Sequence, residues 1–530
     1  MTEEPSARKP GLLRATSTVS VFTLLSRILG LVRDIVIANV FGVSRVTEAF
    51  FVANKIPNML RRFFAEGAFS QGFVPVVNDF RAKKSLAETA TFIAEAAGTL
   101  GGVLLVITGL GVLLAPGFVF VVAPGFVDDD RFSLTVAMLR LTFPYLLFVS
   151  LAALAAGVLN SLGRFALPSL APVILNVALI AAALFVAPHL AQPGLALAGA
   201  VLVAGALQLA ILLPPLAQRG LLKPPRWAPR SPGVRRVREL MLPALLGSSA
   251  AQINILIDNI IASALVAGSV SWLYFSDRLM EFPLGVFGIA LATAILPQLS
   301  SQHANGLTNE FSATLDRGLR LVFAVGLPAA AGLMVLSGPL VVTLFYRGAF
   351  TAEDALMTQW SLIAFAIGLV GFMLVKVLAP GFFARMDTRT PLRCALVALA
   401  VNVVLNGVFV AIALWRDLPG AHAGLAAATS IAAWTNAFLL YRTLRASGTL
   451  GLSPGWQGLL ARLTIAVVAM VVVLVWLTPD LSVWYRWTQL ARVGWLLAFV
   501  ALGVVVFTAA AWLAGLRPRA LLATDSGTAG

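Results

Sequence analysis

Two adjacent stretches decide the fold: SRILGLVRDIVIANVFG at residues 26–42 and EAFFVANKIPNMLRRFFAEGAFSQGFVP at residues 48–75. They are apolar enough to cross a bilayer twice, yet both contain charged side chains, namely Arg27, Arg33, Asp34, Glu48, Lys55, Arg61, Arg62 and Glu66. On insertion scales an arginine at the centre of a membrane helix costs about 2.5 to 3.5 kcal/mol. These segments therefore need anionic partners or a water-filled cavity, which the rest of the chain is expected to provide.

The composition is that of a helical membrane protein. Of 530 residues, 59% are hydrophobic and 12% are charged, and the mean hydropathy is +0.92. Soluble domains have a lower apolar fraction. The apolar runs are continuous over about 20 residues and lack the alternation of barrel strands. We therefore predict an all-α polytopic membrane protein.

Several kinds of functional site lack the residues that they need. The single Cys394 allows no disulfide framework or thiolate cluster, and three scattered histidines offer no zinc site. The net charge of +15 comes from basic residues in short connections between apolar runs, which indicates membrane topology rather than nucleic-acid binding. Without a suitably placed P-loop, HExxH or GxSxG motif, we expect a transporter without a cofactor rather than an enzyme.

The apolar runs and their breakers predict fourteen membrane spans. They lie near residues 19–42, 48–77, 89–123, 132–160, 168–188, 195–217, 239–266, 271–299, 314–345, 355–383, 391–414, 421–443, 457–478 and 489–515. An even number places both termini on one side of the membrane. The basic connections share that side, so both termini are predicted to be cytoplasmic. Trp484, Tyr485 and Trp487 would then form an aromatic anchor at the outer face.

A weak internal repeat divides the chain. EAFFVANKIPN followed by FVP matches SWLYFSDRLME followed by FPLGVFGIALATAILP, with Pro75 and Pro297 at equivalent places. Because six spans separate the copies, they run in the same direction, which implies a parallel repeat of two halves with a cleft between them. The predicted parts are a tail (1–18), a six-helix lobe (19–218), a basic cytoplasmic linker (219–238), a second six-helix lobe (239–445) and two C-terminal helices with a tail (446–530).

Spacing suggests different roles for the charged residues. Arg62 and Glu66 are an i, i+4 pair, so Glu66 is predicted to neutralise Arg62 and leave Arg61 to face a ligand. In the second copy, Arg278 can reach Glu281 at i, i+3. Guanidinium groups match phosphate oxygens bidentately, so the functional interpretation is a cationic cavity for a phosphate-bearing ligand. The alternative is a set of ion pairs that only fix helix register.

Polar residues elsewhere suggest a second site. Asp258 has no base near it in sequence, and Asn402 and Asn406 are i, i+4 on another span. Their oxygens could hold a coupling cation such as Na⁺, or Asp258 could take a proton. The alternative is that all three bond to neighbouring helices. The acidic run at residues 128–130 is interpreted as a solvated loop rather than a metal site.

These segments resemble the signatures of a known family. SRILGLVRD, EAFFVANKIPNMLRRFFAEGAFSQGFVP, SVSWLYFSDRLMEFPLGVFGIALATAILP and KVLAPGFFARMDTRTPLR are similar to those of the MurJ (MviN) lipid II flippase family, within the MOP exporter superfamily. The similarity extends through the first twelve spans and is more diffuse over the last two. It implies fourteen helices with two lobes around a cationic cavity, a groove on the last two helices for an undecaprenyl tail, and alternating access in a bacterial cytoplasmic membrane.

The resemblance also implies a substrate and its contacts. The substrate would be lipid II, an undecaprenyl-pyrophosphate-linked disaccharide-pentapeptide, with membrane lipids and the cell-wall synthesis machinery as further partners. The family's essential arginines correspond to Arg27, Arg33, Arg61 and Arg278, with Ser26 beside the first. Glu48 stands where the family often has Asp, and Glu281 completes the candidate set. A cation site in some members corresponds to Asp258, Asn402 and Asn406, and coupling to Na⁺, H⁺ or the membrane potential is left open.

Other functions fit the same architecture. The lobes could carry another polyprenyl-linked saccharide or export a small molecule, although four arginines would repel a cationic drug. A membrane-embedded glycan enzyme would need catalytic acids in an outer loop, and only residues 128–130 could serve. Loss of function on changing these three residues to Asn would favour the enzyme.

Overall fold

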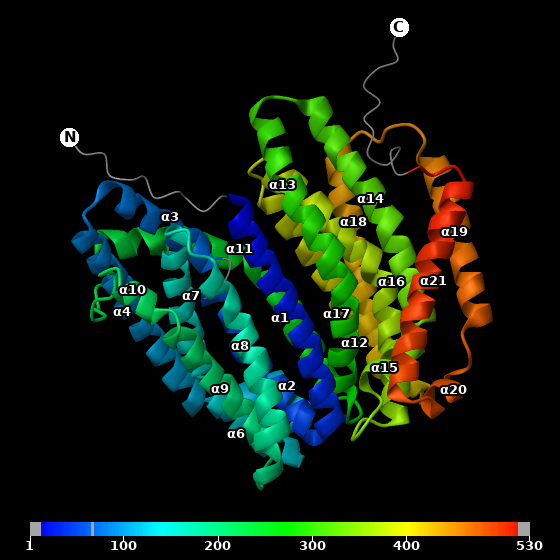
Figure 1. Ribbon diagram of the computed structural model, residues 1–530, viewed down its shortest axis with the longest axis horizontal. Helices are drawn as coiled ribbons and strands as arrows, with labels where there is room; N and C mark the ends of the chain where they lie inside the picture. The colour runs from blue at the N-terminus through cyan, green and yellow to red at the C-terminus, as the bar shows by residue number, and fades with distance from the viewer. Residues whose placement is uncertain (1–11, 65–67, 518–530) are drawn as a thin grey trace. The chain divides into compact units, whose positions relative to one another are not determined.

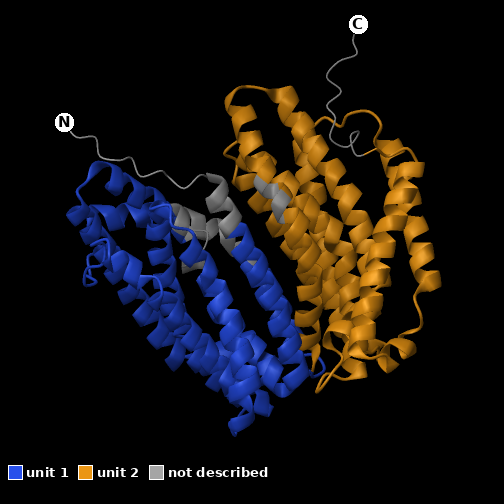
Figure 2. Ribbon diagram, viewed as in Figure 1, with its two compact units in different colours: residues 1–267 blue, residues 268–530 orange. Residues whose placement is uncertain are grey.

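The structure is a computed structural model that describes residues 12–64 and 68–517, and over these residues every regular element is a helix (Figure 1). The backbone divides into two compact units, residues 1–267 and 268–530 (Figure 2). The predicted all-α fold is therefore confirmed.

Unit 1 holds the first group of helices. They are α1 (Leu12–Phe41), α2 (Arg45–Phe64), α3 (Ala68–Lys83), α4 (Leu86–Leu113), α5 (Ala115–Val122), η1 (Pro124–Phe126), α6 (Asp130–Thr142), α7 (Tyr145–Ser161), α8 (Ala166–Ala181), η2 (Ala182–Val186), η3 (Ala187–His189), α9 (Gly194–Ala210), α10 (Leu213–Ala217) and α11 (Pro232–Ser263). Helix α1 packs against α8, α2 against α6, and α11 against α3. These three pairings position the charged side chains of the opening segments.

Unit 2 holds the remaining helices. They are α12 (Ser269–Pro283), η4 (Leu284–Gly288), α13 (Ile289–Ala304), α14 (Thr308–Val335), α15 (Ser337–Phe345), α16 (Ala352–Phe383), α17 (Arg389–Trp415), α18 (Ala421–Ala446), α19 (Trp456–Leu477), α20 (Leu481–Arg486) and α21 (Gln489–Leu513). The long, largely buried α16 packs against α12, α14 and α18. It is the central helix of this unit.

Many of the helices are long and apolar enough to cross a membrane. Among the described residues there are ten such segments: Leu86–Leu113, Asp130–Ser161, Ala166–His189, Gly194–Ala217, Thr308–Val335, Ala352–Phe383, Arg389–Trp415, Ala421–Ala446, Trp456–Leu477 and Gln489–Leu513. The predicted spans near 19–42, 48–77, 239–266 and 271–299 are outside this set, and they carry the charged residues singled out above. The chain is a multi-pass membrane protein, and the total of fourteen spans stays a prediction.

The basic connection that follows α10 is bound along α4. The backbone N–H of Arg226 donates to the carbonyl oxygen of Ala94 at 2.9 Å. A Cβ atom on Gly98 would lie 2.4 Å from the Arg226 backbone, so only glycine permits this approach. This part of the predicted linker is therefore packed against the unit rather than extended away from it.

The last part of the predicted linker is helical. Helix α11 begins at Pro232, and the side chain of Ser231 caps it by accepting a hydrogen bond from the Val234 N–H. Proline suits the first position of a helix because its missing N–H would have no partner there. The helix predicted to begin at residue 239 therefore starts earlier.

The last two long helices pack on α14. Helices α19 and α21 lie side by side, and Leu463, Ala466 and Ala511 form a small apolar core against Ala324 of α14. Their other faces expose aliphatic side chains, as the sequence of a lipid-facing helix would. Both helices are thus attached to unit 2 through α14.

Candidate functional site

The two copies of the sequence repeat have similar local structures. In unit 1, α2 ends at Phe64 and α3 begins at Ala68, with Pro75 inside α3. In unit 2, α12 is followed by the π-helical turn η4 and then by α13, with Pro297 inside it. Each copy is thus a charged helix followed by a second, proline-containing helix. The relation of the two halves by an axis along the membrane normal stays a prediction.

On α1, the guanidinium of Arg33 is bound within unit 1. It lies 2.7 Å from the carboxylate of its neighbour Asp34, and its Nη1 donates to Oδ1 of Asn176 on α8 at 3.1 Å. The same amide donates through Nδ2 to the backbone oxygen of Ser26 at 3.0 Å. Asp34 is buried, so this ion pair offsets the cost of placing its charge inside the unit. A Cβ atom on Gly30 would lie 3.8 Å from Nδ2 of Asn176, an ordinary contact, so the approach of α1 to α8 here does not require glycine.

Arg27 has a different environment from Arg33. Its side chain is partly buried, and among the described residues it forms neither an ion pair nor a hydrogen bond. A guanidinium without a protein partner keeps all its N–H groups available to an anion. Its role in binding an anion stays a prediction.

On α2, the basic residues contact polar side chains of unit 1. Lys55 Nζ donates to Oδ1 of Asn259 at 3.1 Å, and Arg62 Nη1 donates to Oε1 of Gln252 at 3.3 Å, both acceptors lying on α11. Arg61 Nε donates to Oδ1 of Asn58, one turn earlier. The predicted partner of Arg62, Glu66, lies outside the described residues. Helix α11 therefore supplies amide oxygens to this face of α2.

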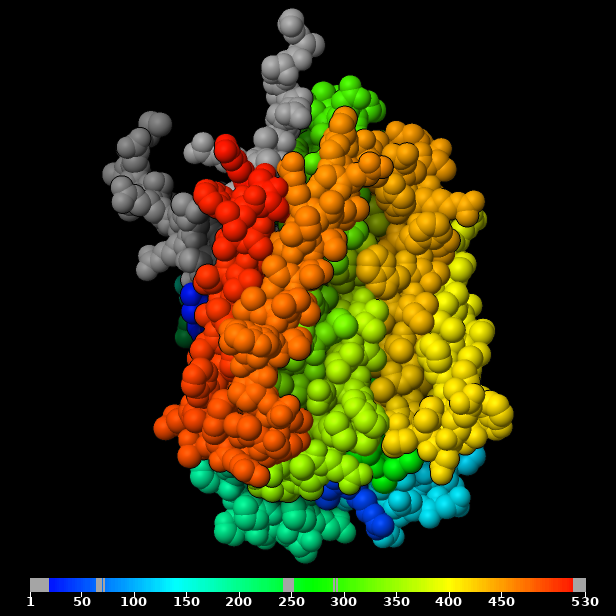
Figure 3. Space-filling view, turned by 90° about the vertical axis from the view of Figure 1, so that its right-hand side faces the viewer, coloured from blue at the N-terminus to red at the C-terminus, as the bar shows by residue number. Residues whose placement is uncertain are grey.

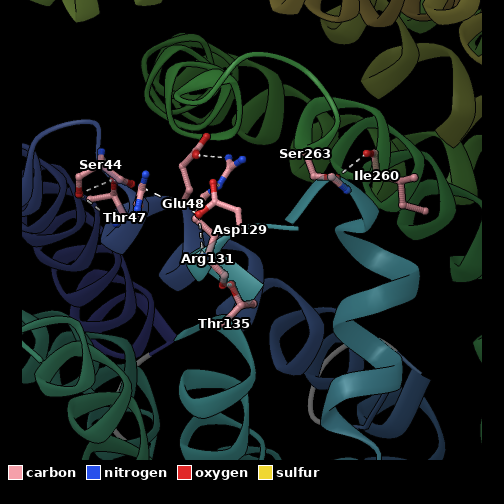
Figure 4. Close-up of polar contacts among 10 residues, drawn as sticks. Ser44, Thr47, Glu48, Asp129, Arg131, Thr135, Ile260 and Ser263 are labelled. Carbon is pink, nitrogen blue, oxygen red and sulfur yellow. Dashed lines mark hydrogen bonds and ion pairs between the residues drawn. The ribbon is translucent and has the colours of Figure 1, made fainter. Parts of the chain in front are cut away.

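Glu48 belongs to a buried ionic network (Figure 4). Its carboxylate accepts from Arg131 Nη1 at 2.7 Å, and both side chains are buried. Arg131 also donates through Nε to Asp129 at 2.9 Å and lies over the Phe126 ring, 4.3 Å from its centroid. The partner of Glu48 is thus a residue on α6, and the pair ties the start of α2 to α6.

The acidic loop before α6 is only partly a solvated loop. Asp128 and Asp130 are exposed, as predicted, but Asp129 caps α6 and accepts from the backbone N–H of Arg131. That hydrogen bond, together with the guanidinium groups of Arg131 and Arg45, lowers the pKa of Asp129 below its ordinary value. The interpretation of the loop as purely solvated was wrong for Asp129, because the sequence does not show that Arg131 is buried beside it.

In unit 2, Arg278 and Glu281 form the predicted i, i+3 ion pair. The distance from Arg278 Nη1 to Glu281 Oε2 is 2.8 Å, and both side chains are exposed. The guanidinium also lies over the Tyr274 ring, 5.1 Å from its centroid. The pair confirms the local prediction. Its combination with the arginines of unit 1 into one cavity stays a prediction.

The residues of the predicted cation site are in separate units. Asn406 donates to Asn402 at 2.9 Å, and Asn402 donates to Thr429 on α18 at 3.1 Å. Both asparagines are buried. Asp258, on α11 of unit 1, accepts from Asn254 at 3.4 Å. Asn402 thus bonds to a neighbouring helix, as the structural alternative requires, and a cation shared with Asp258 stays a prediction.

Sequence reasoning did not identify the partners of these charges. Asn176, Gln252 and Asn259 lie inside apolar runs, where a buried amide has few partners except other side chains and the backbone. Their isolation in such runs was the available signal, as it was for Asp258. Arg131 gave no such signal, because it lies next to an acidic loop.

The chain resembles known proteins over nearly its whole length. The family model described as "Lipid II flippase MurJ" matches residues 37–493. A "Probable lipid II flippase MurJ" of Vibrio cholerae is 44% identical over 97% of this chain and 98% of the relative. The "Lipid II flippase MurJ" of Burkholderia cenocepacia is 43% identical over 96% of this chain and 98% of that protein.

Solved structures show the same fold. A structure titled "Lipid II flippase MurJ, inward closed conformation" has a TM-score of 0.76 at 23% identity, covering 93% of this chain and 98% of its own. An inward-facing multidrug resistance MATE family transporter of the MOP superfamily has a TM-score of 0.67 at 12% identity, covering 82% and 98%. The fold is therefore shared by transporters of that superfamily.

Proposed function

The chain belongs to the lipid II flippase MurJ family, and from this premise we propose that it moves lipid II from the inner to the outer leaflet of the bacterial cytoplasmic membrane. Lipid II is the lipid-linked peptidoglycan precursor, and its charged pyrophosphate and polar saccharide-peptide head cannot cross a bilayer unaided. A protein that carries it needs cations within its membrane-spanning part. The opening segments of this chain supply such cations.

The observation that supports a pyrophosphate site is that the guanidinium of Arg27 forms no ion pair or hydrogen bond with the described residues. Arg33 is paired with Asp34, and Glu48 with the buried Arg131, so each of these two charges has an ion-pair partner within unit 1. Arg27 has no such partner among the residues described. We propose that the pyrophosphate is bound by guanidinium groups that include Arg27 and Arg61 of unit 1 and Arg278 of unit 2. Alternating access then exposes it to one side and afterwards to the other.

Energy for the cycle is available from the membrane potential. A unit charge that crosses the full potential gains about 2.3 kcal/mol per 100 mV. Coupling to Na⁺ or H⁺ through Asp258, Asn402 and Asn406 is a second source that the residues permit. The proposal requires no cofactor and no bond-making chemistry, as expected of a transporter.

The test of this proposal replaces Arg27 in cells depleted of their own lipid II flippase. Arg27→Ala is expected to abolish growth and the labelling of lipid II by an external probe, although the protein still inserts. One charge-assisted contact contributes about 1.5 to 3 kcal/mol, or roughly tenfold to a hundredfold in affinity. Arg27→Lys keeps the charge but loses the bidentate geometry, so partial activity is expected.

The matched control is Arg45→Ala. Arg45 is also in unit 1, but its side chain is 65% exposed and pairs with Asp130 at the surface. Its loss is expected to leave flipping unchanged, since exposed pairs contribute little. Normal growth with any two of Arg27, Arg61 and Arg278 replaced by Ala would rule out the pyrophosphate site.

We propose that both termini are cytoplasmic. Cys394 is buried, so an introduced surface cysteine can be labelled selectively. Ser447→Cys, after α18, is expected to resist a membrane-impermeant maleimide in intact cells, whereas Leu418→Cys, before α18, is expected to react. The reverse pattern would show the opposite orientation.

A further inference from the structure

A pocket of about 580 Å³ lies at one end of unit 2, and none of the predicted site residues lines it. It is formed by the loop between α15 and α16, the start of α16, and the segment that joins α20 to α21. Figure 3 shows α20 and the start of α21 next to that loop at the lower end of unit 2. The lining residues are Tyr346, Arg347, Gly348, Phe350, Thr351, Ala352, Trp487, Gln489 and Arg492.

The charged groups that line the pocket are both cations. Arg347 and Arg492 repel each other, and in the part of the chain that the structure describes neither forms an ion pair. The Nε of Arg347 is buried and has no hydrogen-bond partner among those residues. A buried donor without an acceptor is costly, so the pocket favours a ligand that brings an anionic oxygen.

The second guanidinium has a structural role. Arg492 donates to the backbone oxygens of Trp484, Tyr485 and Tyr346 at 2.8 to 3.0 Å and lies over the Tyr346 ring. These contacts fix its position, but no carboxylate neutralises its charge there. It therefore contributes a fixed positive charge to the pocket, whereas Arg347 donates one long hydrogen bond, 3.5 Å from Nη2 to the backbone oxygen of Thr343, and is the group able to bond a ligand.

The acids of the surrounding segments are not available to the two arginines. Asp354 accepts from Thr351 and from Trp272 Nε1, so it caps α16 and is buried against α12. Glu353 and Asp480 are exposed and do not line the pocket. The positive charge of the pocket is thus left for a ligand to neutralise.

The location of the pocket indicates a ligand at the membrane surface. The predicted spans at residues 314–345, 355–383, 457–478 and 489–515 all end or begin around it, so the predicted topology places it at the level of the lipid headgroups on the outer side. Aromatic rings gather there: Trp487 packs against Trp484 and Trp495, and Tyr346 against Tyr485. Such aromatic belts mark the membrane–water interface. The predicted anchor is thus a packed cluster, in which Trp484 is fully buried.

We propose that this pocket binds the phosphate of an anionic lipid headgroup at the outer surface of the membrane. Arg347 bonds the phosphate oxygens, Arg492 adds its charge, and Trp487 and Tyr346 pack against the glycerol and first acyl carbons. Ala352 and Gln489, the first residues of α16 and α21, line the pocket, and the positive N-terminal ends of these helices favour the same charge. The bound lipid would hold the α19–α21 pair at a fixed level in the membrane.

The test measures lipid retention by the purified full-length protein in a neutral detergent, using native mass spectrometry. Phosphatidylglycerol, which is anionic, is expected to be retained in preference to phosphatidylcholine, which is zwitterionic. Arg347→Gln is expected to weaken phosphatidylglycerol binding about tenfold, as the loss of one charge-assisted contact would. The matched control is Arg416→Gln, because Arg416 is predicted to be on the same side and lies over an aromatic ring but outside the pocket.

A second measurement does not depend on an arginine variant. Brominated phosphatidylglycerol is expected to quench tryptophan fluorescence less in Trp487→Phe than in the unaltered protein. If excess inorganic phosphate displaces the lipid, the pocket recognises the phosphate group itself. If the lipid stays bound in excess phosphate, the pocket recognises the whole lipid. Equal retention of both lipids, equal binding by Arg347→Gln, or equal weakening by Arg416→Gln would each overturn the proposal. None of these outcomes affects the assignment of Arg27.

Discussion

Replacement of Glu48 by Gln separates a structural role of this residue from a substrate-binding one. Glu48 is 1% exposed and its carboxylate lies 2.7 Å from the guanidinium of Arg131, which is itself buried. Removing one partner of a buried ion pair costs about 3 to 5 kcal/mol. Arg131 keeps Asp129 at 2.9 Å in the variant, so part of its charge stays neutralised. We therefore expect Glu48→Gln to lower the free energy of unfolding by about 2 to 3 kcal/mol.

The assay is a titration with sodium dodecyl sulfate in mixed micelles, monitored by tryptophan fluorescence. Arg45→Gln is the control, because its exposed pairs with Asp129 and Asp130 contribute about 0 to 1 kcal/mol. A double-mutant cycle with Arg131→Met isolates the energy of the pair. A loss below 1 kcal/mol for Glu48→Gln, or no coupling in the cycle, would refute the structural role. If lipid II labelling then fell without any loss of stability, Glu48 would belong to the substrate site.

Substitutions at two other acidic residues test whether the charge of Asp258 is used in transport and whether the charge of Asp129 stabilises the fold. Asp258→Asn is expected to abolish the dependence of lipid II flipping on sodium or on external pH if the residue couples transport to a cation, and a variant that keeps the same dependence as the unaltered protein would discard that role. Asp129 has a lowered pKa, so its contribution to stability is present above its ordinary value of 3.8 and is lost as the pH falls through the value in the folded protein. The difference in unfolding free energy between the unaltered protein and Asp129→Asn is thus expected at pH 7 and should shrink as the pH falls below 3.8 toward the lower pKa of the folded protein; a difference that stays constant in acid would contradict this.

Local sequence was sufficient wherever a property depends on residues within a few turns of helix. The long apolar runs predicted an all-α membrane protein because a backbone in lipid must satisfy its own hydrogen bonds. The Arg278–Glu281 pair was predicted from spacing and is present, since residues three apart on a helix are neighbours. The family could be recognised from motifs that are contiguous in sequence.

The partners of the buried charges were decided only by the tertiary structure. Glu48 meets Arg131, Arg33 meets Asn176, and Lys55 meets Asn259 through contacts between helices that are far apart in the chain. Which helix faces which depends on side-chain packing, and hydropathy does not encode it.

Residues 26–42 and 48–75 show what the sequence determined and what was decided only by the tertiary structure. Their sequence by itself determined that charges must be placed inside a membrane protein, because the runs that carry them are too apolar for water. The folded chain decided which of these charges are neutralised within unit 1, as Arg33 and Glu48 are, and left Arg27 with no partner among the described residues. The physical reason is that desolvation must be offset wherever a charge is buried, and only the packed helices specify where that is.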